Sequence, residues 1–219
     1  MQQTLAKKEF TPPQVSLSLH LLGTVLLSRA SSNLSLFSLK KSNKWSLCIF
    51  GTSAKYIDAL SKTGADPRKL FDLKSVRTLC STGSPLSPEG YDFIKDNIKP
   101  DLQIASISGG TDLLSCFVLS NPFDPIVRGE IQCRGLGMDV DIFDDKGNSL
   151  IDQEGELVCK KPFPSMPIKF WNDEGDKKYK SAYFERYMNT WHHGDFAKIT
   201  ESNGFVIFGR SDTTLNQGG

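Results

Sequence analysis

The stretch from residue 76 to residue 110, VRTLCSTGSPLSPEGYDFIKDNIKPDLQIASISGG, decides the fold class. Its apolar start, Val76 to Cys80, predicts a buried strand, and Ser87 to Ile94 predicts a helix with proline at an early position. Leu102 to Ile107 predicts the next strand, and glycines follow both strands. This order is typical of a parallel α/β sheet, whose ligands gather beyond the carboxyl ends of the strands.

The same pattern extends toward the N-terminus. Leu47 to Phe50 predicts another buried strand, and Ser53 to Lys62 predicts a helix with its apolar residues on one side. We therefore assign residues 47–128 to an α/β part. Residues 1–46 are rich in Ser and Leu and stay unassigned.

Toward the C-terminus the pattern changes to short strands separated by glycine-containing turns. These strands are predicted at residues 130–133, 138–143, 156–159 and 205–208. We expect residues 129–212 to form a small antiparallel β subdomain resembling a barrel, followed by a short tail at 213–219.

Composition excludes several classes of protein. The formal net charge is only +1, so no overall field would attract nucleic acid. The apolar stretch from Val15 to Leu27 is shorter than the roughly 20 residues that a membrane-spanning helix needs. Its flanks also fit a secretory signal, which leaves open a secreted domain cleaved near Ala30.

Residues Ser108 to Asp112 are the first candidate site. Two glycines let backbone amides approach a phosphate, Thr111 can donate a hydrogen bond to it, and Asp112 can bind the accompanying Mg²⁺. The alternative is an ordinary tight turn in which Asp112 caps a helix.

A second candidate site combines Gly194-Asp195 with the segment Gly209 to Asp212. Asp195 can accept hydrogen bonds from both hydroxyls of a ribose, and Arg210 can supply a fixed positive charge to the same nucleotide. The alternative is a surface ion pair across a hairpin, a contact worth only about 0 to 1 kcal/mol.

Taken in order, these segments resemble motifs of the adenylate-forming superfamily, which includes acyl-CoA synthetases, peptide-synthetase adenylation domains and luciferases. The corresponding motifs are Gly83-Ser84-Pro85, Ser108 to Asp112, Gly155-Glu156-Leu157, Gly194-Asp195 and Gly209 to Asp212. The amino-acid sequences of residues 106–112 and 155–162 are most similar to those of the acetoacetyl-CoA synthetases. The resemblance covers residues 47–216 and implies part of a large N-terminal domain.

The resemblance implies a reaction and a set of roles. The enzymes activate acetoacetate with ATP and Mg²⁺ to an acyl-adenylate, from which coenzyme A displaces AMP. The roles it implies are adenine binding by Gly83, Ser84 and Pro85, phosphate contact by Ser108 and Thr111, Mg²⁺ binding by Asp112, ribose binding by Asp195, nucleotide contact by Arg210, and a domain hinge at Asp212. Small-molecule substrates and a cytosolic location are implied as well.

Glycine at position 109 bears on the acyl substrate. Acetyl-CoA synthetases carry a tryptophan at the position of Gly109, where it closes the acyl pocket. Glycine at 109, followed by Gly110, is expected to leave room for a longer acid such as a β-keto acid. Pocket size discriminates poorly, by about 1 to 3 kcal/mol per methylene, so acetoacetate rests mainly on the resemblance.

The chain also departs from the superfamily. Residues 1–46 do not reproduce its Ser/Thr/Gly-rich phosphate loop, and the lysine of its C-terminal domain would lie beyond the hinge. Residues that vary within the superfamily occupy the positions of His192 and His193, so we predict no general-base role for them. We expect the 219-residue chain to be inactive by itself; the alternative is a non-catalytic, nucleotide-binding remnant of a truncated gene or pseudogene.

Overall fold

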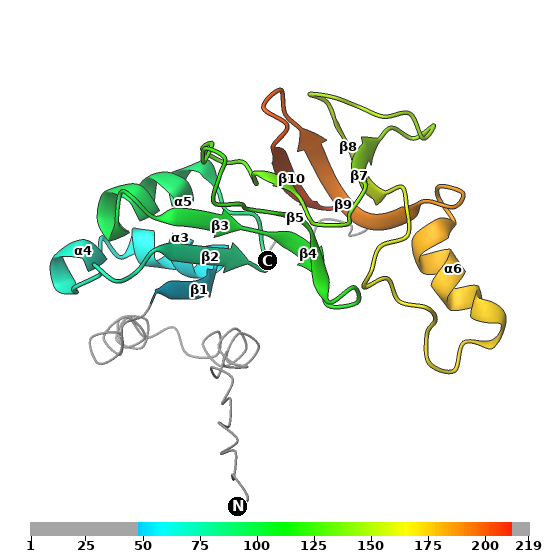
Figure 1. The fold of residues 1–219 in the computed structure, drawn as a ribbon, viewed down its shortest axis with the longest axis horizontal. Coiled ribbons are helices and arrows are strands. Elements are labelled where there is room, and N and C mark those ends of the chain that lie inside the picture. The colour runs from blue at the N-terminus through cyan, green and yellow to red at the C-terminus, as the bar shows by residue number, and fades with distance from the viewer. Residues whose placement is uncertain (1–47, 212–219) are drawn as a thin grey trace, which may run out of the picture.

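The computed structural model describes residues 48–211 as a mixed α/β chain (Figure 1). Its first part is a parallel sheet in the order β1-β2-β3 with helices packed beside it. The strands are β1 (Ile49–Ser53), β2 (Thr78–Thr82) and β3 (Gln103–Ser106). The helices are α3 (Ala54–Lys62), α4 (Pro67–Leu70) and α5 (Pro88–Phe93), the last continued by the π-helix η2 (Ile94–Ile98).

Local sequence accounts for the two longer helices of this part. The Ser53 side chain accepts a hydrogen bond from the backbone N of Tyr56 and caps α3. The Ser87 side chain does the same for α5 by accepting from the backbone N of Gly90, and Pro88 occupies the first turn. The predicted strand–helix alternation is therefore confirmed, with boundaries shifted by a few residues.

The second part consists of two antiparallel sheets and one helix. The smaller sheet has the order β4-β5-β6 and the larger one has the order β10-β9-β8-β7. The strands are β4 (Ser108–Gly110), β5 (Ser115–Leu119), β6 (Cys133–Arg134), β7 (Val140–Phe143), β8 (Glu154–Cys159), β9 (Trp191–Ile199) and β10 (Phe205–Arg210). The helix α6 (Lys177–Phe184) follows the short 3-10 turn η3 (Glu174–Asp176) and packs on β9.

The expected barrel-like closure is wrong. In the described residues, β7 and β10 are the two edges of an open four-stranded sheet, and they do not pair with each other. The smaller sheet is separate from it, with β5 in the middle. Val118 of β5 is paired with Ser108 of β4 on one side and with Arg134 of β6 on the other. Residue 129 thus lies between two strands of one sheet, and the division there stays a prediction.

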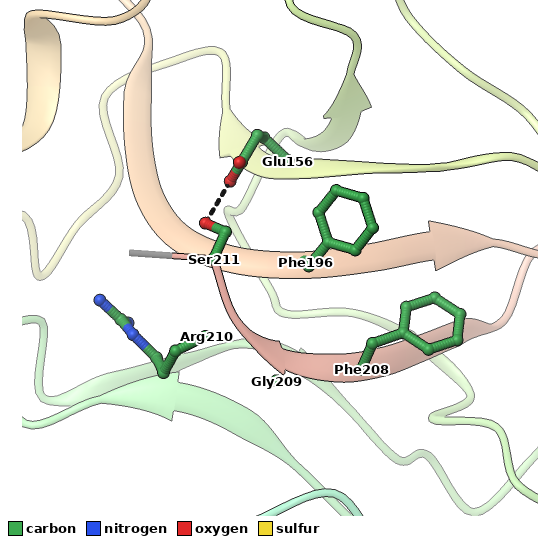
Figure 2. Close-up of a pocket in the computed structure, with 6 residues that line it drawn as sticks. All are labelled: Glu156, Phe196, Phe208, Gly209, Arg210 and Ser211. Carbon is green, nitrogen blue, oxygen red and sulfur yellow. Dashed lines mark hydrogen bonds between the residues drawn. The ribbon is translucent and has the colours of Figure 1, made fainter. Parts of the chain in front are cut away.

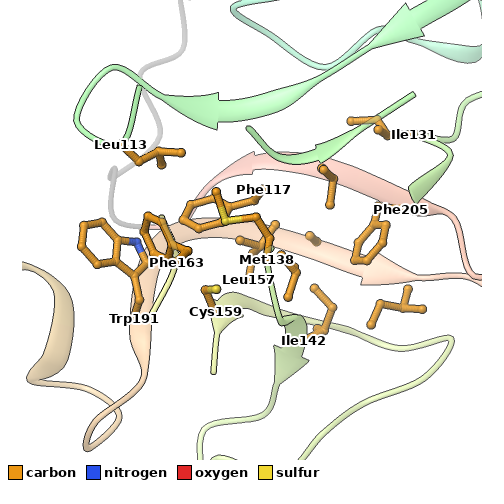
Figure 3. Close-up of a cluster of buried hydrophobic side chains, with 14 of the residues drawn as sticks. Leu113, Phe117, Ile131, Met138, Ile142, Leu157, Cys159, Phe163, Trp191 and Phe205 are labelled. Atoms are coloured by element: carbon orange, nitrogen blue, oxygen red, sulfur yellow. The ribbon is translucent and has the colours of Figure 1, made fainter. Parts of the chain in front are cut away.

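Two hydrophobic cores lie under these sheets. The first packs α3, α5 and η2 against the parallel sheet. The second lies between the two antiparallel sheets, with Trp191 and Phe163 at one end and Phe205 at the other (Figure 3). Hydrogen bonds join the two parts, including one from the Tyr91 hydroxyl to the carbonyl of Glu130 at 2.7 Å.

Helix α4, strand β5, helix α6 and strand β9 were not predicted from the sequence. The segment Gly109-Gly110, expected as a turn, belongs to strand β4. In the described part of the chain, no helix is long and apolar enough to cross a membrane. The segment from Val15 to Leu27 and the hinge position Asp212 lie outside the described residues.

Candidate nucleotide-binding site

The first two candidate loops leave neighbouring strands at the same edge of the parallel sheet. Ser81 in β2 pairs with Ser106 in β3, and the backbone N of Ile107 donates to the carbonyl of Ser81 at 3.1 Å. Immediately after β2, Gly83 has a φ of +82°, a conformation that favours glycine. Ser84 and Pro85 then border an open pocket of about 240 Å³ formed with α3 and α5.

The second loop folds back on itself through β4 and β5. Gly109 lies opposite Cys116, and a Cβ at position 109 would come within 2.3 Å of the carbonyl oxygen of Ser115. Glycine at 109 therefore permits close backbone contact between the two strands. Thr111 and Asp112 follow in an exposed turn. The larger acyl pocket expected beside Gly109 stays a prediction.

A bulge in β9 displays the third segment. Opposite β8, Val158 pairs with His192 and Glu156 pairs with Phe196. Three residues of β9, numbers 193–195, therefore face one residue of β8, and Gly194 takes a φ of +79°. The odd-numbered residues of β9 from 191 to 199 are all buried, so His193 and Asp195 lie on the same, buried face of the strand. The bulge therefore interrupts the pairing with β8 at the residues that carry the candidate ribose site.

A second bulge, in β10, brings Arg210 opposite Asp195. The register shifts between Ile207 and Gly209, so Phe208 is the extra residue. Arg210 Nη1 lies 3.4 Å from Asp195 Oδ1, and the backbone N of Ser211 donates to the carbonyl of Gly194 at 2.8 Å. The Asp195 side chain is buried, whereas that of Arg210 is 44% exposed. This pair is therefore anchored on one side and open to solvent on the other.

His193 lies where the second loop meets the β9 bulge. A Cβ at Gly110 would come within 2.8 Å of its Cε1 atom and 3.0 Å of its Nε2 atom. Burial lowers the pKa of His193, and this outweighs the carboxylates of Asp195 and Asp112, which act in the opposite direction. The imidazole is therefore neutral at pH 7.

Tyr183 connects helix α6 to the same loop. Its hydroxyl donates to Asp112 Oδ2 at 2.7 Å, and its ring stacks on Trp191 with centroids 3.7 Å apart. Burial raises the pKa of Tyr183, and the Asp112 carboxylate raises it further. The hydroxyl consequently stays protonated and serves as the donor.

Glu156 anchors the end of β10 from the other side. Its carboxylate is buried and accepts a hydrogen bond from Ser211 Oγ at 2.6 Å (Figure 2). It also accepts a hydrogen bond from Arg186, and it lies 2.9 Å from His192 Nε2. Burial raises its pKa, but the bonds from His192 and Ser211 and the charge of Arg186 outweigh this, so the pKa lies below its usual value.

An open pocket of about 350 Å³ lies beside this anchor. Glu156, Phe196 and Phe208 line it together with the residues 209–211. In Figure 2 the Arg210 side chain points away from the two phenylalanines, whereas Ser211 points toward Glu156. The end of β10 is thus fixed by the bond between Ser211 and Glu156, while the Arg210 side chain is partly exposed beside Asp195.

The carboxylate of Asp112 is suited to Mg²⁺ that accompanies a nucleotide. Among residues 48–211 there is no cluster of three or more His, Cys, Asp or Glu side chains that could hold a metal alone. Asp112 offers one exposed carboxylate. Mg²⁺ in nucleotide sites is commonly held by one or two carboxylates together with phosphates, so the residues fit that ion.

Sequence reasoning gave no positioning role to three residues of this site. Tyr183 is 71 positions away from its partner Asp112, and no sequence pattern predicts that contact. His193 was considered only as a catalytic base. Glu156 lay in a recognised motif, and a carboxylate directly before the apolar Leu-Val-Cys was the signal that it needs buried partners.

Comparison with known proteins agrees with this geometry. The chain is 59% identical over 171 residues to acetoacetyl-coenzyme A synthetase of Rhizobium meliloti (strain 1021), covering 78% of this chain and 26% of that protein. It is 45% identical over 184 residues to acetoacetyl-CoA synthetase of Caenorhabditis elegans, covering 83% and 26%. No family model matches the chain.

Solved structures give the same result for the fold. The structure of acetoacetyl-CoA synthetase from Streptomyces lividans superposes with a TM-score of 0.75 at 42% identity, covering 83% of this chain and 29% of that one. An anthranilate CoA ligase, AuaEII, shares the fold with a TM-score of 0.69 at 19% identity. The chain spans about a quarter of the length of the curated relatives it matches. It is a homologue of the acetoacetyl-CoA synthetases, which are adenylate-forming enzymes, over that part of their length.

Proposed function

We propose that this chain forms part of the nucleotide site of an acetoacetate-CoA ligase. In the proposed reaction, ATP and acetoacetate give an acyl-adenylate and pyrophosphate, and coenzyme A then displaces AMP to give acetoacetyl-CoA. The observation that carries the proposal is the meeting of three segments of the chain. Arg210 of β10 lies 3.4 Å from Asp195 of β9, and His193 of β9 lies against Gly110, two residues before Asp112.

The proposed roles follow from what each group can do. Residues 83–85 bind adenine, and the buried carboxylate of Asp195 accepts hydrogen bonds from the ribose hydroxyls. Thr111 donates to the α-phosphate. Arg210 places its exposed guanidinium beside the same nucleotide and helps to neutralise the charge that repels an attacking carboxylate.

Asp112 is the proposed protein ligand of Mg²⁺, and the phosphates supply other ligands. The ion, when bound, neutralises charge on the phosphates. The residues themselves position the reactants, and this is where most of the catalytic advantage of such a site lies. Cytosolic location is part of the proposal and agrees with the five cysteines being free thiols.

Calorimetric titration of the 219-residue chain with AMP tests the nucleotide site. We expect binding, and we expect Asp195→Asn to weaken it by roughly tenfold or more, because a hydrogen bond to a charged group contributes about 1.5 to 3 kcal/mol. Asp152→Asn is the matched control, since Asp152 is exposed and pairs with Lys198 in another turn. Equal affinity in the wild type and Asp195→Asn would contradict the ribose assignment.

Acetoacetate-dependent exchange of pyrophosphate into ATP tests the chemistry. We expect AMP binding without exchange in the 219-residue chain, because it spans about a quarter of the length of the curated relatives it matches. Exchange supported by acetoacetate but not by acetate would instead show that this chain performs adenylation. Failure to bind AMP at all would remove the basis of the proposal.

A further inference from the structure

We infer that Tyr183, Trp191 and His193 form an aromatic clamp that positions the Ser108–Asp112 loop, with Tyr183 fixing the carboxylate of Asp112. The inference rests on the proposed function for its ligand, but the clamp itself is a property of the ligand-free chain. No role at the site was assigned to these three side chains by the motifs.

The clamp holds the loop at two points. At one of them the Tyr183 hydroxyl donates to Asp112 Oδ2 at 2.7 Å. At the other the imidazole of His193 lies against Gly110, where an added Cβ would come within 2.8 Å of His193 Cε1 and 2.1 Å of Asp112 Oδ1. Glycine at 110 is thus matched to the histidine and to the position of the carboxylate.

Trp191 joins the two ends of the clamp. It stacks on Tyr183 at 3.7 Å with an angle of 14° between the rings, and it lies nearly parallel to His193 at 6.5 Å. Its Nε1 donates toward His193 Nδ1 at 3.4 Å. Because Nδ1 accepts this bond, the proton of the neutral ring is assigned to Nε2.

The second core makes the clamp rigid. Trp191 is almost completely buried, and the ring of Phe163 contacts it edge-on at 5.3 Å. Phe117 contacts His193 edge-on at 4.8 Å. Thr111 and Asp112 lie in the exposed turn beyond β4, which would otherwise have many conformations. Fixing it in advance reduces the ordering cost of binding a phosphate.

Hydrogen exchange of the ligand-free 219-residue chain tests the clamp directly. Tyr183→Phe removes one hydroxyl and keeps the ring on Trp191. We expect amides of residues 108–112 to exchange about tenfold faster, because a hydrogen bond to a charged group is lost. The matched control is Tyr187→Phe, whose hydroxyl donates to the carbonyl of Asp144 instead. Unchanged exchange in Tyr183→Phe would overturn the clamp, whether or not the chain binds nucleotide.

Comparison of AMP with adenosine separates positioning from general stability. Adenosine lacks the phosphate, so we expect Tyr183→Phe to weaken AMP binding about tenfold and to leave adenosine binding unchanged. His193→Ala, which removes the ring that lies against Gly110, should have the same selective effect. An equal loss for both ligands would overturn the positioning role. A wild-type chain that binds neither ligand would contradict the proposed function, while the exchange measurement would still decide the clamp.

Discussion

The two hydrophobic cores of this chain differ in their relation to the candidate site. The first core, under the parallel sheet, supports the strands from which the loops leave, and its helices are capped by local serines. The second core includes Trp191, Phe117 and Leu113. The rings of Trp191 and Phe117 contact the His193 ring itself. The first core therefore sets where the loops begin, whereas the second also sets how one of them is shaped.

This difference teaches that packing and ligand binding are separable in one part of the molecule and coupled in the other. A substitution in the first core should lower stability while leaving nucleotide affinity unchanged in the molecules that stay folded. A substitution at the clamp end of the second core should lower both. The following three predictions test this distinction, beginning with the largest expected effect.

Trp191→Ala should have the largest effect because it removes a buried ring and the middle of the aromatic clamp. We expect the free energy of unfolding to fall by about 3 to 5 kcal/mol and AMP affinity to fall by more than tenfold. Urea denaturation and AMP titration measure the two effects. Retention of full AMP affinity by the folded variant would show that the second core is no more coupled to the site than the first.

Ile57→Ala should have an intermediate effect that is confined to stability. Ile57 lies on α3 and is fully buried in the first core. We expect the free energy of unfolding to fall by about 2 to 5 kcal/mol because a cavity forms. AMP affinity, measured where the variant is folded, should match the wild type. A parallel loss of affinity would remove the distinction between the cores.

The pH dependence of stability should show the smallest effect, and it should arise in the second core. Burial lowers the pKa of His193 from its ordinary value of 6.5, so the unfolded chain takes up this proton at a higher pH than the folded chain does. Stability should therefore decrease as the pH falls below about 6.5. Urea midpoints measured at several pH values test this expectation. His193→Gln should reduce the dependence, whereas Ile57→Ala should retain it.

The strands and the two longer helices of the first part could be predicted because each is signalled locally. Ser53 and Ser87 cap helices, and the apolar runs that begin at Leu47, Val76 and Leu102 correspond to the three parallel strands. The second part was predicted less well. Strand β9 was missed because two of its buried positions carry the polar residues His193 and Asp195, so the sequence does not show an apolar alternation there.

Tertiary contacts explain the remaining differences. Whether β7 meets β10 depends on the twist and packing of the whole sheet, so an open sheet and a barrel have similar strand patterns. The candidate site was predicted at the level of motifs, since Asp112, Asp195 and Arg210 lie near the same imidazole. The clamp was not predicted, because the contact of Tyr183 with Asp112 depends on the packing of α6 on β9.

The bulge in β10 decides which residue of this strand faces Asp195. With Phe208 as the extra residue, Arg210 lies opposite Asp195; if Phe208 instead paired with Phe196 as in a regular ladder, Gly209 would lie opposite Asp195 and Arg210 would turn toward the other face of the sheet. Straightening of the strand would therefore keep both the arginine and the aspartate in the sequence and still separate them. A change in backbone conformation is enough to dismantle the pair without any substitution at either position.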